Sequence, residues 1–127
     1  MSSIKEQIGE YLANEGLRPK DEEFGFYFRY QMLNFLIHWD EEDELFLRIS
    51  LPSIFSCDEN NRADVLEAAN KVNLGRKVVK CVITDDDVWI VAEQLMDSDP
   101  KFDDFIPRTL SMLLQARDCF YDALKGA

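Results

Sequence analysis

The residues that could bind a metal ion or act as nucleophiles are few and widely spaced. The chain has one histidine, His38, and three cysteines, and neighbouring members of this set lie 19 or more residues apart. A structural zinc site needs Cys and His ligands at short spacings such as Cys-x-x-Cys, and no such pair occurs here. We therefore predict no zinc site, and we expect Cys81 and Cys119 to be small buried side chains.

Known catalytic patterns are also missing from the sequence. His38 lies between Ile37 and Trp39 in an apolar segment, and no Gly-x-Ser-x-Gly motif is present to supply a nucleophile. The five glycines form no phosphate-binding loop. We therefore predict no catalytic residues and no cofactor, and we expect that the chain is not an enzyme.

Acidic clusters are the best candidates for binding a hard cation. They are Glu41 to Glu44, Asp85 to Asp87, and the set Asp97, Asp99, Asp103 and Asp104. None has the ligand spacing of a calcium-binding loop. Solvated turns and helix N-termini explain them better, because carboxylates stabilise the first turn of a helix. We predict no metal site, so a strong chelator should leave the melting temperature unchanged.

Composition limits the compartment and the partners. The chain has 127 residues, which predicts one domain over 1–127, and its net charge of −11 disfavours nucleic acid and anionic membranes as partners. No apolar run approaches the roughly 20 residues of a membrane span. The polar N-terminus lacks the pattern of a signal peptide, and an odd number of cysteines fits a reduced compartment. We expect a soluble, cytoplasmic protein.

Hydrophobic periodicity predicts an α+β fold in the order helix, three strands, helix, two strands, helix. The helices are expected at 3–15, 61–73 and 104–124, and the strands at 24–30, 35–40, 45–51, 78–84 and 88–95. Neighbouring strands joined by short turns favour a five-stranded antiparallel sheet with the helices packed on it.

Local signals set several element boundaries. Ser3 and Glu6 have the spacing of a capping box. Asn60 or Asn61 should cap the second helix, and Asp104 should cap the last helix, which would place Pro107 in its first turn. Pro52 should end the third strand.

Alternation along the first three strands separates two faces. The apolar face should meet the helices and consists of Phe24, Phe26, Phe28, Phe35, Ile37, Trp39, Leu45, Leu47 and Ile49. If Phe26 and Phe28 share a face with Ile37, the first turn holds an even number of residues. If Ile37 shares a face with Leu47, the second turn holds an odd number.

The opposite face mixes aromatic, aliphatic and basic side chains on an acidic protein. It consists of Tyr27, Arg29, Leu36, His38, Phe46 and Arg48. Tyr and Arg are enriched at the energetic centres of protein interfaces, so we predict that these residues bind a partner. The alternative is an ordinary half-exposed sheet face with scattered apolar residues.

The predicted element order and several segments resemble the type III secretion chaperones and the related YbjN-like family. The similar segments are FYFRYQMLNFLIHWDEEDELFLRISLP (26–52), the helix NNRADVLEAANKVN and the C-terminal RDCFYDAL. The turn after FRYQ often carries Gly in the family, whereas this chain has Met32. The resemblance implies an acidic dimer that binds extended segments of other proteins and has no catalytic residues.

Two functions remain compatible with the sequence. The first is a chaperone-like or regulatory module that binds a protein or peptide, and the second is a small ligand-binding or enzymatic domain whose site is not visible in the sequence.

The hairpin 78–95 is apolar on both faces, so we expect both faces to be covered. A second copy is the simplest cover, which predicts a homodimer formed through the second helix and this hairpin.

Overall fold

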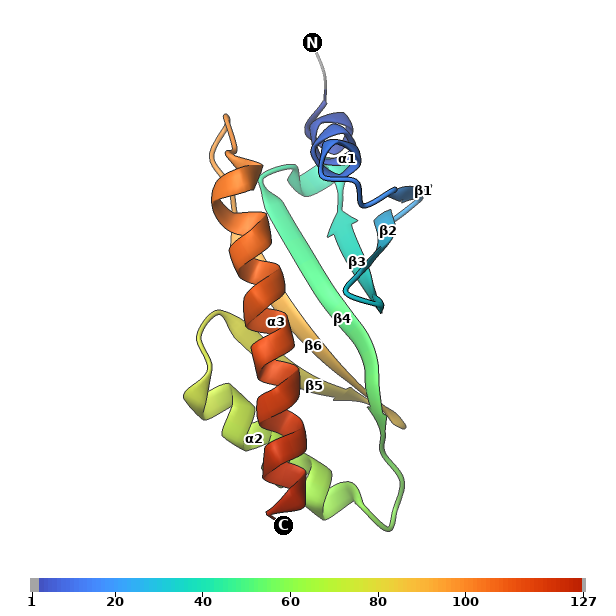
Figure 1. The fold of residues 1–127 in the computed structure, drawn as a ribbon, viewed down its shortest axis with the longest axis vertical. Helices are drawn as coiled ribbons and strands as arrows, with labels where there is room; N and C mark the ends of the chain where they lie inside the picture. Colours follow the sequence, from blue (N-terminus) through green and yellow to red (C-terminus); the bar gives the residue numbers. More distant parts are fainter. Residues whose placement is uncertain (1–2, 127) are drawn as a thin grey trace.

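The computed structural model describes residues 3–126, which form three helices packed on an antiparallel sheet (Figure 1). The sheet has six strands in the order β1-β2-β3-β4-β6-β5. The elements are α1 (Ile4–Asn14), β1 (Lys20–Glu22), β2 (Gly25–Tyr30), β3 (Leu33–Trp39), the 3-10 turn η1 (Glu41–Asp43), β4 (Phe46–Ser56), α2 (Arg62–Gly75), β5 (Val79–Thr84), β6 (Asp87–Leu95) and α3 (Phe102–Lys125). The α+β class is as predicted, but the predicted number of strands, five, is wrong.

The additional strand is β1, whose sequence Lys-Asp-Glu gives no strand signal. Its residues pair with the start of β2, where Lys20 lies opposite Tyr27. Strand formation depends on pairing with a neighbour more than on intrinsic preference, so a short polar segment can extend the edge of a sheet. This explains why alternation alone did not predict β1.

Both predictions about strand register are confirmed. Tyr30 pairs with Leu33 across a turn of two residues, Gln31 and Met32, which both have positive φ. Trp39 pairs with Leu47, so the seven residues 40–46 separate this pair. The Gln31–Met32 turn thus has the sign of φ typical of a type I′ hairpin, although neither residue is the glycine that this turn favours.

One face of the sheet carries the core and is covered by all three helices (Figure 1). Six residues of the predicted apolar face are buried there: Phe26, Phe28, Phe35, Ile37, Leu47 and Ile49. Leu51 continues the same alternation along β4 and is also buried. They meet Ile8 and Leu12 of α1 and Leu110, Leu113 and Phe120 of α3 within one hydrophobic cluster.

Phe24 and Leu45 were placed on the apolar face by prediction, and this placement is wrong. Their exposed fractions are 37% and 38%, and both precede the strands rather than belonging to them. At Gly25, φ is 146°, a conformation that side chains rarely allow. The alternation of β2 therefore begins after Gly25, and the Phe24 ring lies 4.9 Å from the ring of His38.

Strand β4 continues through Pro52 to Ser56, so the prediction that Pro52 ends it is wrong. Its pairing with β6 is interrupted between Leu51 and Phe55, where Ser53 has a φ of 55°. Proline is tolerated at such a bulge, because the residue does not need to donate a hydrogen bond to the neighbouring strand.

The helix N-termini differ from the predictions in two of three cases. Ser3 caps α1 as predicted and accepts a hydrogen bond from the Glu6 N–H at 3.1 Å. Asn61 precedes α2, but its side chain bonds to the backbone of Asp58 and Ser56 instead of capping the helix.

Helix α3 begins at Phe102 after Lys101, not after Asp104. Pro107 is therefore the sixth residue of the helix, beyond the first turn that the sequence suggested. Because proline has no N–H, the backbone carbonyl four residues before Pro107 receives no helical hydrogen bond. Pro107 is exposed, so water can donate to this carbonyl instead.

Candidate protein-binding face of the sheet

The structure places all six predicted partner-binding residues on the face of the sheet opposite the helices, here called the helix-free face. Residues opposite each other in an antiparallel pair share a face. Tyr27 lies opposite Leu36, and His38 lies opposite Arg48. Arg29 pairs with Asn34, and Phe46 pairs with Leu95 of β6.

The helix-free face extends across the second hairpin, whose residues were not among the predicted partner-binding residues. Six residues of β5 and β6 lie on it: Lys80, Val82, Trp89, Val91, Glu93 and Leu95. Within one chain, the helices cover only the face of this hairpin that carries Val88, Ile90 and Ala92, so its other face is open in residues 3–126. Its cover by a second copy stays a prediction. The sequence did contain a signal for these residues. Side chains at 80 and 82, and at 89, 91 and 93, are two positions apart, so each set lies on one face of its strand.

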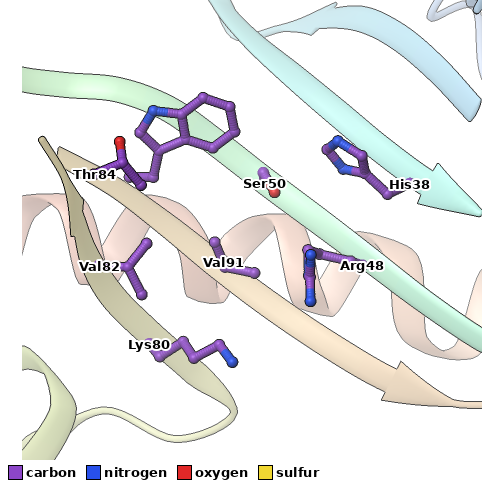
Figure 2. Close-up of a pocket in the computed structure, with 8 residues that line it drawn as sticks. His38, Arg48, Ser50, Lys80, Val82, Thr84 and Val91 are labelled. Atoms are coloured by element: carbon purple, nitrogen blue, oxygen red, sulfur yellow. The ribbon is translucent and has the colours of Figure 1, made fainter. Parts of the chain in front are cut away.

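A hollow of about 350 Å³ lies on the helix-free face across β3, β4, β6 and β5 (Figure 2). Its lining residues are His38, Arg48, Ser50, Lys80, Val82, Thr84, Trp89 and Val91. The indole N–H of Trp89 donates to the Asp87 carboxylate at 2.8 Å, which fixes the orientation of this aromatic side chain. The hollow therefore has a preorganised aromatic wall.

A row of charged side chains borders this hollow and joins three strands. Arg48 donates to the Glu93 carboxylate through Nη2 at 2.8 Å and Nε at 3.2 Å, and Lys80 contacts its other oxygen at 2.8 Å. The hydrogen bonds from Lys80 and Arg48 lower the pKa of Glu93 below its usual value. Such partly exposed pairs contribute at most about 1 kcal/mol to stability, so their main effect is to fix the positions of the two cations.

Two buried polar atoms near this row have no hydrogen-bond partner within residues 3–126. They are Nδ1 of His38 and Oγ of Ser50, and both residues line the hollow. An unsatisfied buried polar group costs about 1–3 kcal/mol, and most such groups in proteins are paired. These two atoms therefore carry hydrogen-bonding capacity that residues 3–126 leave unused.

A second hollow of about 390 Å³ shares His38 and Arg48 with the first. Its other lining residues are Glu23, Phe24, Trp39, Asp40, Asp43 and Phe46. The Arg48 guanidinium lies 5.8 Å from the centre of the Phe46 ring, a cation–π distance. The first hollow is thus bordered by basic side chains and the second by acidic ones, with His38 and Arg48 between them.

The protonation of His38 should make stability depend on pH. Burial, followed by the positive charge of Arg48, lowers the pKa of His38. The folded protein therefore favours the neutral ring, and this contribution is complete above the ordinary pKa of about 6.5. It is lost as pH falls from that value towards the lower pKa of the folded state.

We expect unfolding experiments at pH 7.5 and pH 5.5 to show a smaller loss of stability for His38→Gln than for the unchanged protein. The comparison isolates His38, since both proteins share every carboxylate that titrates in this range. An NMR titration that gave folded His38 a pKa at or above its ordinary value would contradict this expectation.

The cysteines and the acidic clusters are the other residues that could carry chemistry. Burial, with a smaller effect of Cys119, raises the pKa of Cys81 to about 12, so its thiol is a poor nucleophile at neutral pH. The acidic clusters form turns, as predicted: Asp40 accepts from the Glu42 N–H, and Asp97 accepts from the Asp99 N–H. Within residues 3–126, no three His, Cys, Asp or Glu side chains are grouped so that they could hold a metal ion.

The same α+β fold occurs in solved structures of other proteins. The Yersinia pestis type III secretion chaperone SycH, crystallised in complex with a stable fragment of YscM2, aligns with a TM-score of 0.63 and 13% identity over 93% of this chain and 99% of that chain. An uncharacterized protein from Methanothermobacter thermautotrophicus aligns with a TM-score of 0.68 and 14% identity over 97% of both chains. YbjN from E. coli aligns with a TM-score of 0.65 and 11% identity over 93% of this chain and 89% of that chain.

Residues 5–124 match the YbjN family model, described as "Putative bacterial sensory transduction regulator". The chain therefore belongs to the YbjN family, and the resemblance expected from the sequence is confirmed. None of the curated proteins matches the chain. No helix within residues 3–126 is long and apolar enough to cross a lipid bilayer.

Proposed function

We propose that the chain is a non-catalytic, cytoplasmic protein-binding module, formed as one domain by residues 1–127, with a chaperone-like or regulatory role. The observation that carries this proposal is the helix-free face, on which aromatic, aliphatic and basic side chains gather outside the hydrophobic core. Leu95 on this face is 79% exposed, and Phe46 and Trp89 are partly exposed. A contiguous apolar patch with a polar rim is typical of a protein-binding surface.

The partner that fits this face is an extended protein segment. The two hollows lie next to each other and share His38 and Arg48, so successive side chains of one extended segment can enter both. The structure of SycH with a fragment of YscM2 is consistent with such a role on a similar fold. The basic and acidic borders suit a segment that carries both apolar anchors and charges.

Combining Phe46→Ser with Arg48→Glu should abolish capture of the native partner. Loss of one energetically central side chain commonly weakens binding by about 2 kcal/mol, or roughly thirtyfold, and the charge reversal adds repulsion. Neither side chain belongs to the hydrophobic core, so the melting curve should change little. The measurement is affinity capture from the native host, quantified by mass spectrometry and accompanied by thermal melting.

Met32→Ser combined with Arg18→Glu is the matched control. Like the Phe46/Arg48 variant, it replaces one apolar residue by Ser and one Arg by Glu, so the change in net charge is the same. Both positions are exposed and lie away from the hollows. Normal capture by the control and none by the Phe46/Arg48 variant is the expected pattern. Normal capture by both variants would show that the partner binds elsewhere.

We also propose that the chain forms a homodimer through α2 and the second hairpin. Leu66 and Leu74 of α2 are 49% and 79% exposed, and Val78 at the start of the hairpin is 55% exposed. A second copy would cover these side chains, and symmetric pairs are the commonest oligomers. Sedimentation equilibrium at micromolar concentration should give twice the chain mass of 14.8 kDa, and a value near 14.8 kDa would count against the dimer.

A further inference from the structure

The first hollow has a buried floor and two unlike borders. Ser50 and Val91 form the floor and are 1% and 6% exposed. Arg48 lies on one side of the floor and Val82 on the other (Figure 2), where Trp89 pairs with Val82 across β5 and β6. Lys80 pairs with Val91, and its Nζ contacts the Glu93 carboxylate that Arg48 also binds. The hollow therefore offers cationic groups at one end and an apolar wall at the other.

The floor contains the hydroxyl group that the fold leaves unpaired. Oγ of Ser50 is buried, has no partner within residues 3–126 and belongs to a residue that lines the hollow. Nδ1 of His38, on the neighbouring strand, is also buried and without a hydrogen-bond partner within these residues. A hydroxyl group can donate to a ligand oxygen, and so can an imidazole nitrogen that carries a proton. One acceptor placed over the floor could satisfy these groups.

The charges beside the floor favour an anionic acceptor. Arg48 uses Nε and Nη2 for Glu93, which leaves Nη1 for another acceptor, and Lys80 makes one ion pair with three available donors. Two cations share one carboxylate, so this site is positive by one charge on a chain of net charge −11. Charge-assisted hydrogen bonds to a carboxylate are stronger than those to a neutral acceptor.

We propose that this hollow is a subsite for the carboxylate of a Glu or Asp in the partner segment, with an apolar side chain two residues away resting against Trp89 and Val82. This inference rests on the proposed function and specifies the partner. Residues two apart in an extended chain point to the same side and lie about 7 Å apart, so they can reach from the cationic border to the apolar border.

His38 provides a direct readout, because it is the one histidine of the chain. The probes are two capped peptides, acetyl-Ser-Glu-Thr-Phe-Ser-amide and the same peptide with Gln in place of Glu. We expect the Glu peptide to shift the His38 ring signals saturably in NMR and to raise the pKa of His38. The Gln peptide should bind at least about tenfold more weakly, because it lacks the charge-assisted hydrogen bonds.

Ser50→Ala separates a binding role of the hydroxyl group from a structural one. The variant should bind the Glu peptide about threefold more weakly or worse, since it loses one hydrogen bond. Its melting temperature should be unchanged or higher, because the hydroxyl is buried without a partner. Ser111→Ala on α3 is the control and should leave peptide binding unchanged. Normal binding of the Glu peptide by Ser50→Ala would overturn the role of this residue.

Three results would overturn the subsite itself: equal affinity for the two peptides, no shift of the His38 signals at millimolar peptide, or binding of free 3-phenylpropionate as tightly as the Glu peptide. The last result would assign the hollow to a small organic acid. If capture depends on Phe46 and Arg48 while the two peptides bind equally, only the carboxylate subsite fails. The Glu peptide could bind and the Gln peptide not, while capture of the native partner is unchanged in the Phe46/Arg48 variant. In that case the proposed function fails, and so does the assignment of the hollow to the partner segment.

Discussion

Gly25→Ala should lower the free energy of unfolding by about 3 kcal/mol or more, a large effect for the addition of one methyl group. A Cβ at this position would overlap the carbonyl oxygen of Ile37 and press on the backbone of Trp39. Backbone atoms of a paired strand cannot move aside as the end of a side chain can. The φ of 146° adds strain for any residue other than glycine.

Gly75→Ala is the matched control, with an effect of opposite sign. Gly75 is the last residue of α2, and a Cβ there would meet no atom of residues 3–126 within 4 Å apart from its chain neighbours and the backbone of its own helix. Because alanine favours the helix over glycine, we expect stability to rise by about 0.5–1 kcal/mol. Denaturant unfolding of both variants is the measurement. A Gly25→Ala protein as stable as the unchanged chain would show that β2 does not approach β3 as closely as described.

Asn73→Ala should destabilise the protein by about 2–3 kcal/mol and expose the edge of the sheet. The Asn73 side chain on α2 accepts from the Cys81 N–H at 2.6 Å and donates to the Cys81 carbonyl at 3.2 Å. Cys81 lies in the edge strand β5, so this amide occupies the position of a further strand. Each buried backbone group left unpaired costs about 1–3 kcal/mol.

The exposed edge should also promote association between chains, because an edge with free N–H and C=O groups can pair with another strand. Light scattering should therefore show concentration-dependent aggregation of Asn73→Ala near its melting temperature. Asn70→Ala, at an exposed position of the same helix, is the control and should neither destabilise nor aggregate. Identical behaviour of the two variants would mean that Asn73 does not protect the edge.

Alternation predicted the parts of the fold in which side-chain burial decides the conformation. The faces of β2, β3 and β4 follow from apolar residues two positions apart, and both turn parities follow from matching these faces. Features that depend on the backbone were not predictable in this way. The conformation at Gly25, the bulge after Leu51 and the polar strand β1 each depend on a neighbouring strand that one segment does not reveal.

The sequence predicted the part of the candidate site on β2, β3 and β4 but not the part on β5 and β6. Tyr27, Arg29, Leu36, His38, Phe46 and Arg48 share the helix-free face because period two places them there. The residues of β5 and β6 were missed, since the strand order β4-β6-β5 brings distant segments together. Ser50 gives no signal in the sequence, because its lack of a hydrogen-bond partner is a property of the folded environment.

Photocrosslinking tests whether the partner binds the helix-free face. A benzoylphenylalanine placed at position 36 lies on this face, and one placed at position 108 lies on α3, on the other side of the sheet. After irradiation with the captured partner, mass spectrometry identifies the crosslinked residues. We expect crosslinks from position 36 to one short contiguous segment of the partner and none from position 108. Crosslinks from position 108 alone would contradict this expectation.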